Sequence, residues 1–266
     1  MSLARALRSP AARHLAPWAV PVLLIAIWEA AAQTGAITPR LLPAPSAVAV
    51  AFWENARSGV LFHHMAISAG RALQGMLIGG GIGFLLGVLN GVSRPAETLL
   101  DSSLQMLRNV PHLAIIPLVI LWFGIDETAK IFLVAIGVAF PIYLNTFHGI
   151  RTVDPGLIEM ARIYGLGRWA LFSRVILPGA LPDVLVGVRF SLGIMWLTLI
   201  VAETISASAG IGYMTMNARE FLQTDVVLLG IIIYALLGKA ADLLTRAVER
   251  RALAWHPAYH PAEAKP

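Results

Sequence analysis

Cysteine is absent from the 266-residue chain, so neither disulfide bonds nor thiolate metal sites can form. Charged residues are also scarce: they make up 13% of the sequence, whereas soluble globular domains carry about a quarter. Hydrophobic residues account for 58%, and the mean hydropathy is +0.74. So much apolar surface needs lipid around it, and the composition predicts a polytopic membrane protein.

Signatures of catalysis are missing as well. The only Gly-Lys pair, Gly238-Lys239, lacks the following Ser/Thr and the earlier glycine of a Walker A motif, so the chain cannot hydrolyse ATP by the P-loop route. No G-x-S-x-G nucleophile elbow occurs. His63 and His64 are adjacent rather than four residues apart, so they do not share a helix face, and His256 and His260 lie in a proline-bearing tail; we predict no metal site at either pair. A membrane enzyme is therefore disfavoured.

Long apolar runs are what the sequence does contain. A membrane-spanning helix needs about 20 mostly apolar residues. We predict an all-α fold with six transmembrane helices, which places both termini on the same side of the membrane. The six segments are residues 15–33, 68–92, 103–123, 129–148, 183–205 and 226–245.

Loop charges indicate which side holds the termini. With a cytoplasmic N-terminus, basic residues in the loops favour the cytoplasm by roughly three to one, as the positive-inside rule requires. The net charge is +5, but the basic residues are scattered, which argues against a nucleic-acid partner. The cytoplasmic set is Arg5, Arg8, Arg13, Arg94, Arg151, Arg162, Arg168, Arg174, Arg246, Arg250, Arg251 and Lys265, and the external set is Arg40, Arg57, Lys130 and Arg219.

The chain divides into three predicted parts. Residues 1–59 form an N-terminal transmembrane helix with an external connection, residues 60–250 a compact core, and residues 251–266 a cytoplasmic tail. The first apolar run could be a secretory signal, but Glu29 lies late in it and more apolar segments follow. We interpret it as a retained membrane helix.

The second apolar segment carries glycines four residues apart. Small residues at this spacing let helices approach closely within lipid, where packing drives association. This predicts a buried helix in a tight bundle; the alternative is a moving hinge at Gly79-Gly80-Gly81. The repeated glycines are Gly75, Gly79, Gly83, Gly87 and Gly91.

Polar residues within the apolar segments are candidates for a translocation pathway. The third segment combines Arg108, Asn109 and His112 with Pro111 and Pro117, and broken helices often line such a path. A kink with only a packing role is the alternative. In the fifth segment, Arg189 and Glu203 lie 14 positions apart, too far to pair within one helix. For these two residues, snorkelling or a subunit interface is the alternative to lining the pathway.

A charged stretch, Glu159–Pro182, separates the fourth and fifth segments on the cytoplasmic side. Asp154-Pro155 predicts a helix start, Gly165 and Gly167 allow a sharp turn, and Pro178 is expected to end a second short helix. Arginines recur every six residues and alternate with apolar side chains. Two short amphipathic helices beneath the membrane form a suitable dock for a soluble partner; the arginines are Arg162, Arg168 and Arg174.

This stretch resembles a motif of the membrane-spanning permease subunits of type I bacterial ABC importers. Their cytoplasmic loop carries the pattern E-A-A-x3-G-x9-I-x-L-P. Here Glu159, Ala161 and Gly165 match, as do Leu177 and Pro178, and the two departures are Met160 for Ala and Val175 for Ile. The fold implied is the MetI-like ABC transmembrane type-1 domain. Stretches such as FPIYLNTFHGIRTVDPGLIEMAR and ETISASAGIGYM are similar to the sulfonate, taurine and nitrate branch of the family.

The resemblance implies a set of partners in the bacterial inner membrane. Two permease copies would pair within the lipid, two ATPase subunits would bind their cytoplasmic loops, and a periplasmic solute-binding protein would deliver the solute. ATP and Mg would be bound by the ATPase, and none by this chain. Glu159 would contact the ATPase and Gly165 would permit the turn; the docking residues implied are Glu159, Met160, Ala161, Gly165, Leu166, Gly167, Arg168, Leu177 and Pro178.

The resemblance also implies import of a small anionic solute by alternating access. Aliphatic sulfonate or taurine is the first expectation, and nitrate, bicarbonate or a thiamine precursor are alternatives with similar permeases. The external loop Ser206–Tyr213 is expected to meet the binding protein or to close the gate. A self-contained channel or secondary carrier is the rival class, although the several mid-membrane carboxylates and inverted repeat typical of carriers are not evident.

Overall fold

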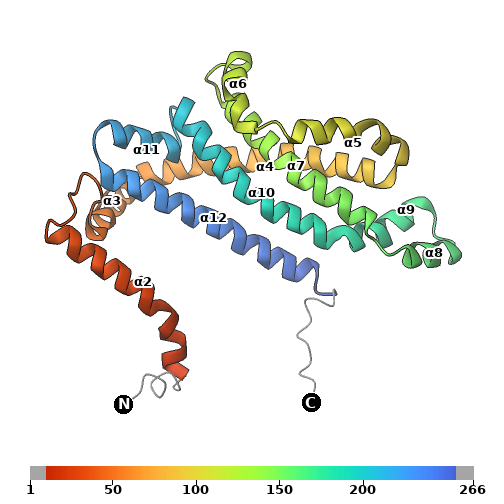
Figure 1. The fold of residues 1–266 in the computed structure, drawn as a ribbon, viewed down its shortest axis with the longest axis horizontal. Helices are drawn as coiled ribbons and strands as arrows, with labels where there is room; N and C mark the ends of the chain where they lie inside the picture. Colours follow the sequence, from red (N-terminus) through yellow and green to blue (C-terminus); the bar gives the residue numbers. More distant parts are fainter. Residues whose placement is uncertain (1–9, 256–266) are drawn as a thin grey trace. The chain divides into compact units, whose positions relative to one another are not determined.

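A computed structural model describes residues 10–255, and within this range the backbone contains helices, turns and bends but no strand (Figure 1). The all-α prediction is therefore confirmed for this part of the chain. The elements in order are α2 (Pro10–Gln33), α3 (Pro45–Arg57), α4 (Val60–Val92), α5 (Arg94–Arg108), the 3-10 helix η1 (His112–Ile115), α6 (Ile116–Phe123), α7 (Glu127–Arg151), α8 (Pro155–Ile163), α9 (Arg168–Leu171), the π-helical segment η2 (Phe172–Ile176), α10 (Leu177–Ser206), α11 (Ile211–Glu220) and α12 (Thr224–Ala252).

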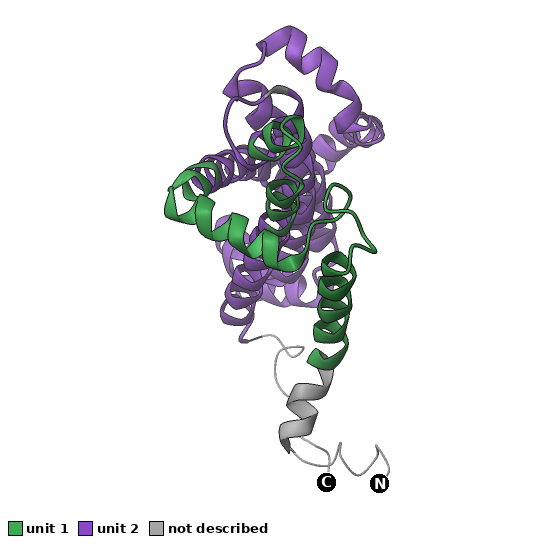
Figure 2. Cartoon of the chain, turned by 90° about the vertical axis from the view of Figure 1, so that its left-hand side faces the viewer, with its two compact units in different colours: residues 1–64, 214–232 green, residues 65–213, 233–266 purple. Residues whose placement is uncertain are grey.

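The folded chain consists of two compact units, which Figure 2 colours separately. The first unit contains the chain up to residue 64 together with residues 214–232, and the second contains residues 65–213 and the chain from residue 233. The division of the sequence at residue 59 stays a prediction, and most of the predicted tail, residues 256–266, lies outside the described residues.

Among the described residues, four helices are long and apolar enough to cross a membrane: α4, α7, the continuous run Arg168–Ile205 and α12. These correspond to the second, fourth, fifth and sixth predicted segments. Of the first segment, Trp18–Gln33 is a shorter apolar helix. In the region of the third segment, two helices joined by a sharp bend are long and apolar enough to cross a membrane only when they are counted together. The observed spans are therefore consistent with the six predicted.

The third segment, residues 103–123, is a broken helix, as its prolines predict. α5 ends at Arg108, and the helical path resumes at His112 after a bend of 79°. Pro111 explains the interruption, because proline has no N–H to donate and disfavours helical geometry in the residue before it. Non-helical backbone at membrane depth is tolerated only where it contacts protein or a wet cavity. The backbone between α5 and η1 therefore needs contact with protein or with a water-filled cavity.

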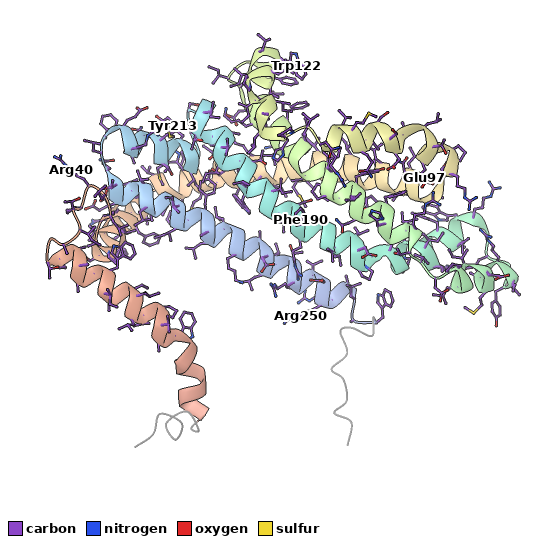
Figure 3. All side chains as sticks on the ribbon, in the orientation of Figure 1. Arg40, Glu97, Trp122, Phe190, Tyr213 and Arg250 are labelled. Atoms are coloured by element: carbon purple, nitrogen blue, oxygen red, sulfur yellow. The ribbon has the colours of Figure 1, made fainter. Side chains whose placement is uncertain are left out.

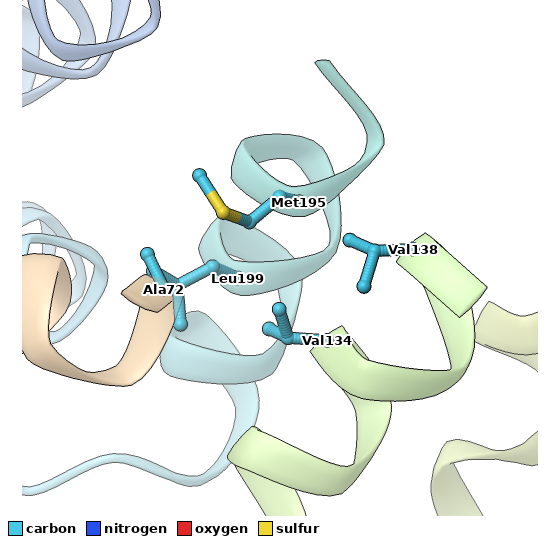
Figure 4. Packing of buried hydrophobic residues seen from close by; sticks show 5 residues of the cluster. All are labelled: Ala72, Val134, Val138, Met195 and Leu199. Carbon is cyan, nitrogen blue, oxygen red and sulfur yellow. The ribbon is translucent and has the colours of Figure 1, made fainter. Parts of the chain in front are cut away.

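The core of the second unit is formed by α7 and α10, which pack along each other (Figure 1). Buried side chains from these helices and from α4 meet in one cluster, shown in Figure 4. Val134 and Leu199 are fully buried there. The cluster consists of Ala72, Val134, Val138, Met195 and Leu199.

The glycines of α4 face α7 at close range. A Cβ atom added to Gly79 would overlap the carbonyl oxygen of Ala135, and one added to Gly83 would overlap that of Ala139. Backbone thus lies directly against backbone, which a larger side chain prevents. At Gly75, Gly87 and Gly91, the added atom would meet the side chains of Val134, Thr146 and Ile150.

Hydrogen bonds connect the elements of the first unit. Glu29 of α2 accepts bonds from the backbone N–H of Ser46 at 3.0 Å and from its hydroxyl at 2.7 Å. The hydroxyl of Thr224, at the start of α12, donates to the carbonyl of Pro39 at 2.9 Å. The late carboxylate of the first apolar segment therefore fixes the start of α3.

Candidate functional site

The charged stretch between α7 and α10 begins with a capped helix. The Asp154 side chain accepts a hydrogen bond from the backbone N–H of Gly156 at 2.8 Å. Pro155 occupies the first helical position, where its missing N–H costs nothing. These two residues start α8 as their types predict, and α8 carries Glu159 on an exposed face.

Gly165 ends α8 in the left-handed conformation, with φ of 77°. The N–H of Leu166 donates to the carbonyl of Ala161 at 3.0 Å, and that of Gly165 donates to the carbonyl of Arg162 at 2.9 Å. These two bonds form a Schellman motif, in which glycine is favoured because it lacks a Cβ atom. The sharp turn therefore depends on Gly165, whereas Gly167 has an ordinary φ of −66°.

This difference predicts unequal effects of two similar substitutions. Gly165→Ala should destabilise the turn by about 1–2 kcal/mol, because alanine resists the left-handed region. No described atom lies within 4 Å of a Cβ atom at either glycine, so no steric clash confuses the comparison. Hydrogen exchange of residues 159–171 should accelerate in Gly165→Ala and stay unchanged in Gly167→Ala. Equal exchange in the two variants would contradict the assignment.

The second short helix does not end at Pro178, and that prediction was wrong. α9 continues through the π-helical segment η2 into α10, so the chain is helical from Arg168 to Ile205. Pro178 is the second residue of α10, which begins directly after η2. A wider π turn there accommodates a residue that cannot donate the usual bond. A single helical run thus joins the charged stretch to a candidate membrane span.

Large apolar side chains are exposed on the same stretch as Glu159. Ile163, Tyr164 and Trp169 are 81%, 77% and 76% exposed, and Met160 is half-exposed. Such a patch on a charged segment marks an interaction surface. Of the residues implied for docking, Glu159, Met160, Gly165, Gly167 and Arg168 are exposed, Leu166, Leu177 and Pro178 are half-buried, and Ala161 is buried.

Two pathway candidates of the third segment lie together. Arg108 and His112 flank the break between α5 and η1, and both line a cavity of about 330 Å³ against α7 and α10. His112 Nε2 lies 2.9 Å from the hydroxyl of Thr198 on α10. Asn109 instead forms the C-cap of α5, and it is not among the residues that line this cavity.

Glu203 lies elsewhere, in a buried network near the end of α10. Its side chain is fully buried and accepts from Arg71 Nη1 at 2.7 Å. It also accepts from the hydroxyls of Ser68 and Tyr234, at 2.8 Å each, and from the N–H of Gly212 at 2.9 Å. Burial of this carboxylate is sustained by a partner cation and several donors together.

The same network holds the loop after α10. Arg71 donates to the carbonyl of Ala209 at 2.6 Å, and the N–H of Ile211 donates to Ser68 at 2.9 Å. Along another edge of the guanidinium, Arg71 Nε and Nη2 donate to the two carboxylate oxygens of Glu127, the first residue of α7, at 2.5 and 2.6 Å. Three helices and one loop are therefore tied by one arginine.

Arg189 is paired as well. It donates to Glu249 of α12 at 2.5 Å and lies 3.6 Å from Asp242 of the same helix. These ion pairs accommodate the charge of Arg189, and its pathway role stays a prediction. At the last residue of α7, Arg151 binds Glu97 of α5, and Figure 3 labels Glu97.

Arg71, Ser68 and Tyr234 were not identified from the sequence. One signal was available, because Arg71 and Glu203 each lie within a few residues of the external end of their predicted segments. Charges at equal depth in different helices can pair, since neither can remain alone in lipid. Ser68 and Tyr234 carry no comparable signal.

Within residues 10–255, no cluster of three or more His, Asp or Glu side chains is arranged to hold a metal ion.

Comparison with known proteins identifies the family. Residues 79–253 match the family described as "Binding-protein-dependent transport system inner membrane component". The chain is 63% identical over 251 residues to the "Putative aliphatic sulfonates transport permease protein SsuC" of Escherichia coli (strain K12), covering 94% of this chain and 95% of the relative. It is 50% identical over 240 residues to the protein of the same name from Bacillus subtilis (strain 168), covering 90% and 87%.

A solved structure shows the same fold. A chain described as an amino acid ABC transporter with histidines aligns with a TM-score of 0.59 at 21% identity, over 71% of this chain and 92% of that one. At this identity the likeness concerns the fold alone. The family match spans well over half of the sequence, and the relatives cover nearly all of it. The chain therefore belongs to the family of binding-protein-dependent transport system inner membrane components.

Proposed function

We propose that this protein is the permease subunit of an ATP-driven importer of aliphatic sulfonates in the bacterial inner membrane. The observation that carries the proposal is the 63% identity, over almost the full length of both chains, to a protein named for aliphatic sulfonate transport. The permease role itself follows from the family and needs no catalytic residue in this chain.

ATP hydrolysis takes place in a separate subunit that binds the stretch from Asp154 to Pro178. Two ATPase copies carrying ATP and Mg bind two permease copies, and a periplasmic binding protein supplies the sulfonate. The exposed Glu159 beside an apolar patch supports this docking surface, because a charged anchor among desolvated apolar side chains favours a specific partner. Both termini lie in the cytoplasm, in agreement with the loop charges.

Movement reaches the membrane through the continuous helix from Arg168 to Ile205. A rigid helix transmits displacement of its cytoplasmic end to the span, as in other rigid-body switches. Closure of the ATPase pair pulls α8 and α9, and α10 tilts toward the outward-facing arrangement. The chain itself performs no chemistry in this cycle.

Uptake by the reconstituted importer tests the assignment of the solute. Proteoliposomes that contain the permease, its ATPase and its binding protein should accumulate radiolabelled ethanesulfonate only with ATP. Taurine, nitrate, bicarbonate and a thiamine precursor serve as competitors. Accumulation of one of these without ethanesulfonate would reject the sulfonate assignment, and flux through the permease alone would indicate the channel or carrier class.

Charge reversal tests the docking surface. Glu159→Lys should lower the amount of ATPase that co-purifies with the permease, and ATP-dependent uptake should fall at least roughly tenfold, as for loss of an interface anchor. Glu159 is exposed, so the fold of the permease should persist. Glu54→Lys, at an exposed position of α3, is the matched control. Normal ATPase recovery with Glu159→Lys would exclude the docking role.

A further inference from the structure

The break in the third segment opens onto a cavity that the docking surface and the buried network do not use. Its volume is about 330 Å³, within the range of roughly 300–1,000 Å³ typical of small-molecule sites. Three parts of the second unit line it: the break around Arg108–His112, the middle of α7 and the middle of α10. It lies along the middle of two helical runs that are long and apolar enough to cross a membrane.

One side of the cavity carries an unpaired positive charge. Arg108 is exposed, and in the described part of the chain no carboxylate lies within ion-pair distance of it. Arg71, Arg151 and Arg189 are all paired, so Arg108 differs from these other arginines of the second unit. A guanidinium at membrane depth is costly unless water or an anion solvates it.

Two further polar side chains line the cavity, His112 and Asn145. His112 is held by its contact with Thr198, and Asn145 donates one amide hydrogen to the carbonyl of Pro141 at 2.8 Å. Among residues 10–255, no acidic side chain lines the cavity. The polar side therefore presents hydrogen-bonding groups and one cation without a competing carboxylate, which favours an anion.

Most of the remaining lining is apolar. Phe140 of α7 and Phe190 and Ile194 of α10 are among these lining residues. Phe190, which Figure 3 labels on α10, is 64% exposed. A small inorganic anion such as nitrate has no hydrocarbon part that could contact these apolar side chains. An alkanesulfonate has one, because it joins an anionic head to a hydrocarbon tail that gains free energy when it leaves water.

We propose that this cavity is a sulfonate-binding subsite within the permease, with the sulfonate group at Arg108 and the alkyl chain against Phe190. The inference rests on the proposed function. It assigns recognition of the solute to the permease in addition to any binding protein. Guanidinium suits this role, since its fork of donors matches the oxygens of an oxyanion.

Direct binding is the first test. The detergent-solubilised permease–ATPase complex, without binding protein, is titrated with ethanesulfonate by isothermal calorimetry. We expect measurable binding that Arg108→Gln weakens at least about tenfold, as for loss of a charge-assisted bond. Arg108→Lys should retain part of the affinity. Arg57→Gln, which also changes an exposed arginine at the last position of a helix, should bind like the unchanged protein.

Chain length provides the second test. Phe190→Ala should reduce uptake of hexanesulfonate several-fold more than uptake of ethanesulfonate, because the longer tail loses more apolar contact. This variant alters an exposed side chain, so it keeps the proposal testable if Arg108→Gln fails to assemble with the ATPase.

The experiments distinguish an incorrect subsite from an incorrect proposed function. If the unchanged importer accumulates no sulfonate, the function is wrong and the subsite with it. If it accumulates sulfonate while Arg108→Gln and Phe190→Ala match it in affinity and chain-length preference, the subsite is rejected and the function stands.

Discussion

Replacement of Glu203 by alanine is expected to lower the free energy of unfolding by about 3–5 kcal/mol. The change removes the shared acceptor of Arg71, Ser68 and Tyr234, and Arg71 would remain buried with only Glu127 as a charged partner. A buried donor without an acceptor bears its full desolvation cost. Thermal and denaturant unfolding of the purified permease in detergent, followed by tryptophan fluorescence, would measure the effect.

A double substitution separates the charge from the packing. Glu203→Leu combined with Arg71→Met should recover stability relative to Glu203→Ala, because well-packed apolar residues can replace a buried ion pair at little cost. Glu54→Ala, at an exposed carboxylate of α3, should change stability by less than about 0.5 kcal/mol. A Glu203→Ala effect as small as this control would show that the network contributes little.

Gly79→Ala is the second substitution with a large expected effect. The new methyl group would overlap the carbonyl oxygen of Ala135, and backbone cannot rotate away as a flexible side chain can. We expect α4 and α7 to separate, at a cost of about 1–3 kcal/mol, as for other overpacked interiors. The midpoint of unfolding should fall, and cysteine cross-linking between the two helices should slow.

Gly81→Ala is the matched control on the same helix. Within the described chain, nothing lies within 4 Å of a Cβ atom at Gly81, and the residue is exposed. Alanine is the better helix former by about 1 kcal/mol, so this variant should be as stable as the unchanged protein or more so. If the three glycines 79–81 acted as a hinge, both variants should impair transport equally; a selective loss at Gly79 supports packing.

Local chemistry allowed part of the cytoplasmic stretch to be predicted. Asp154, Pro155 and Gly165 act within one turn of their own positions, so capping rules suffice to place the start and end of α8. The same rules failed at Pro178, because they treat proline as a helix terminator. The π-helical segment η2 before it lets the helix continue.

Long-range partners were not predictable in the same way. The fourfold glycine spacing predicts that α4 approaches another helix, but only the folded chain places the carbonyls of α7 against Gly79 and Gly83. Arg108, Arg189 and Glu203 look alike in the sequence as charges near apolar runs. In the structure, Arg189 and Glu203 are paired and Arg108 has no carboxylate partner among the described residues. Their roles in a pathway stay predictions.

The sequence by itself determined the membrane class, the positions of most spans, the bias of basic loops and the motif that relates the chain to importer permeases. These properties follow from composition and from contacts between near neighbours. Only the folded chain shows the 79° angle of that bend, the continuity of α9 with α10, and the pairing of Arg71 with Glu203. The reason is physical: a charge or a broken helix in lipid must find partners, and the partner of Arg71 lies more than 100 residues away along the chain.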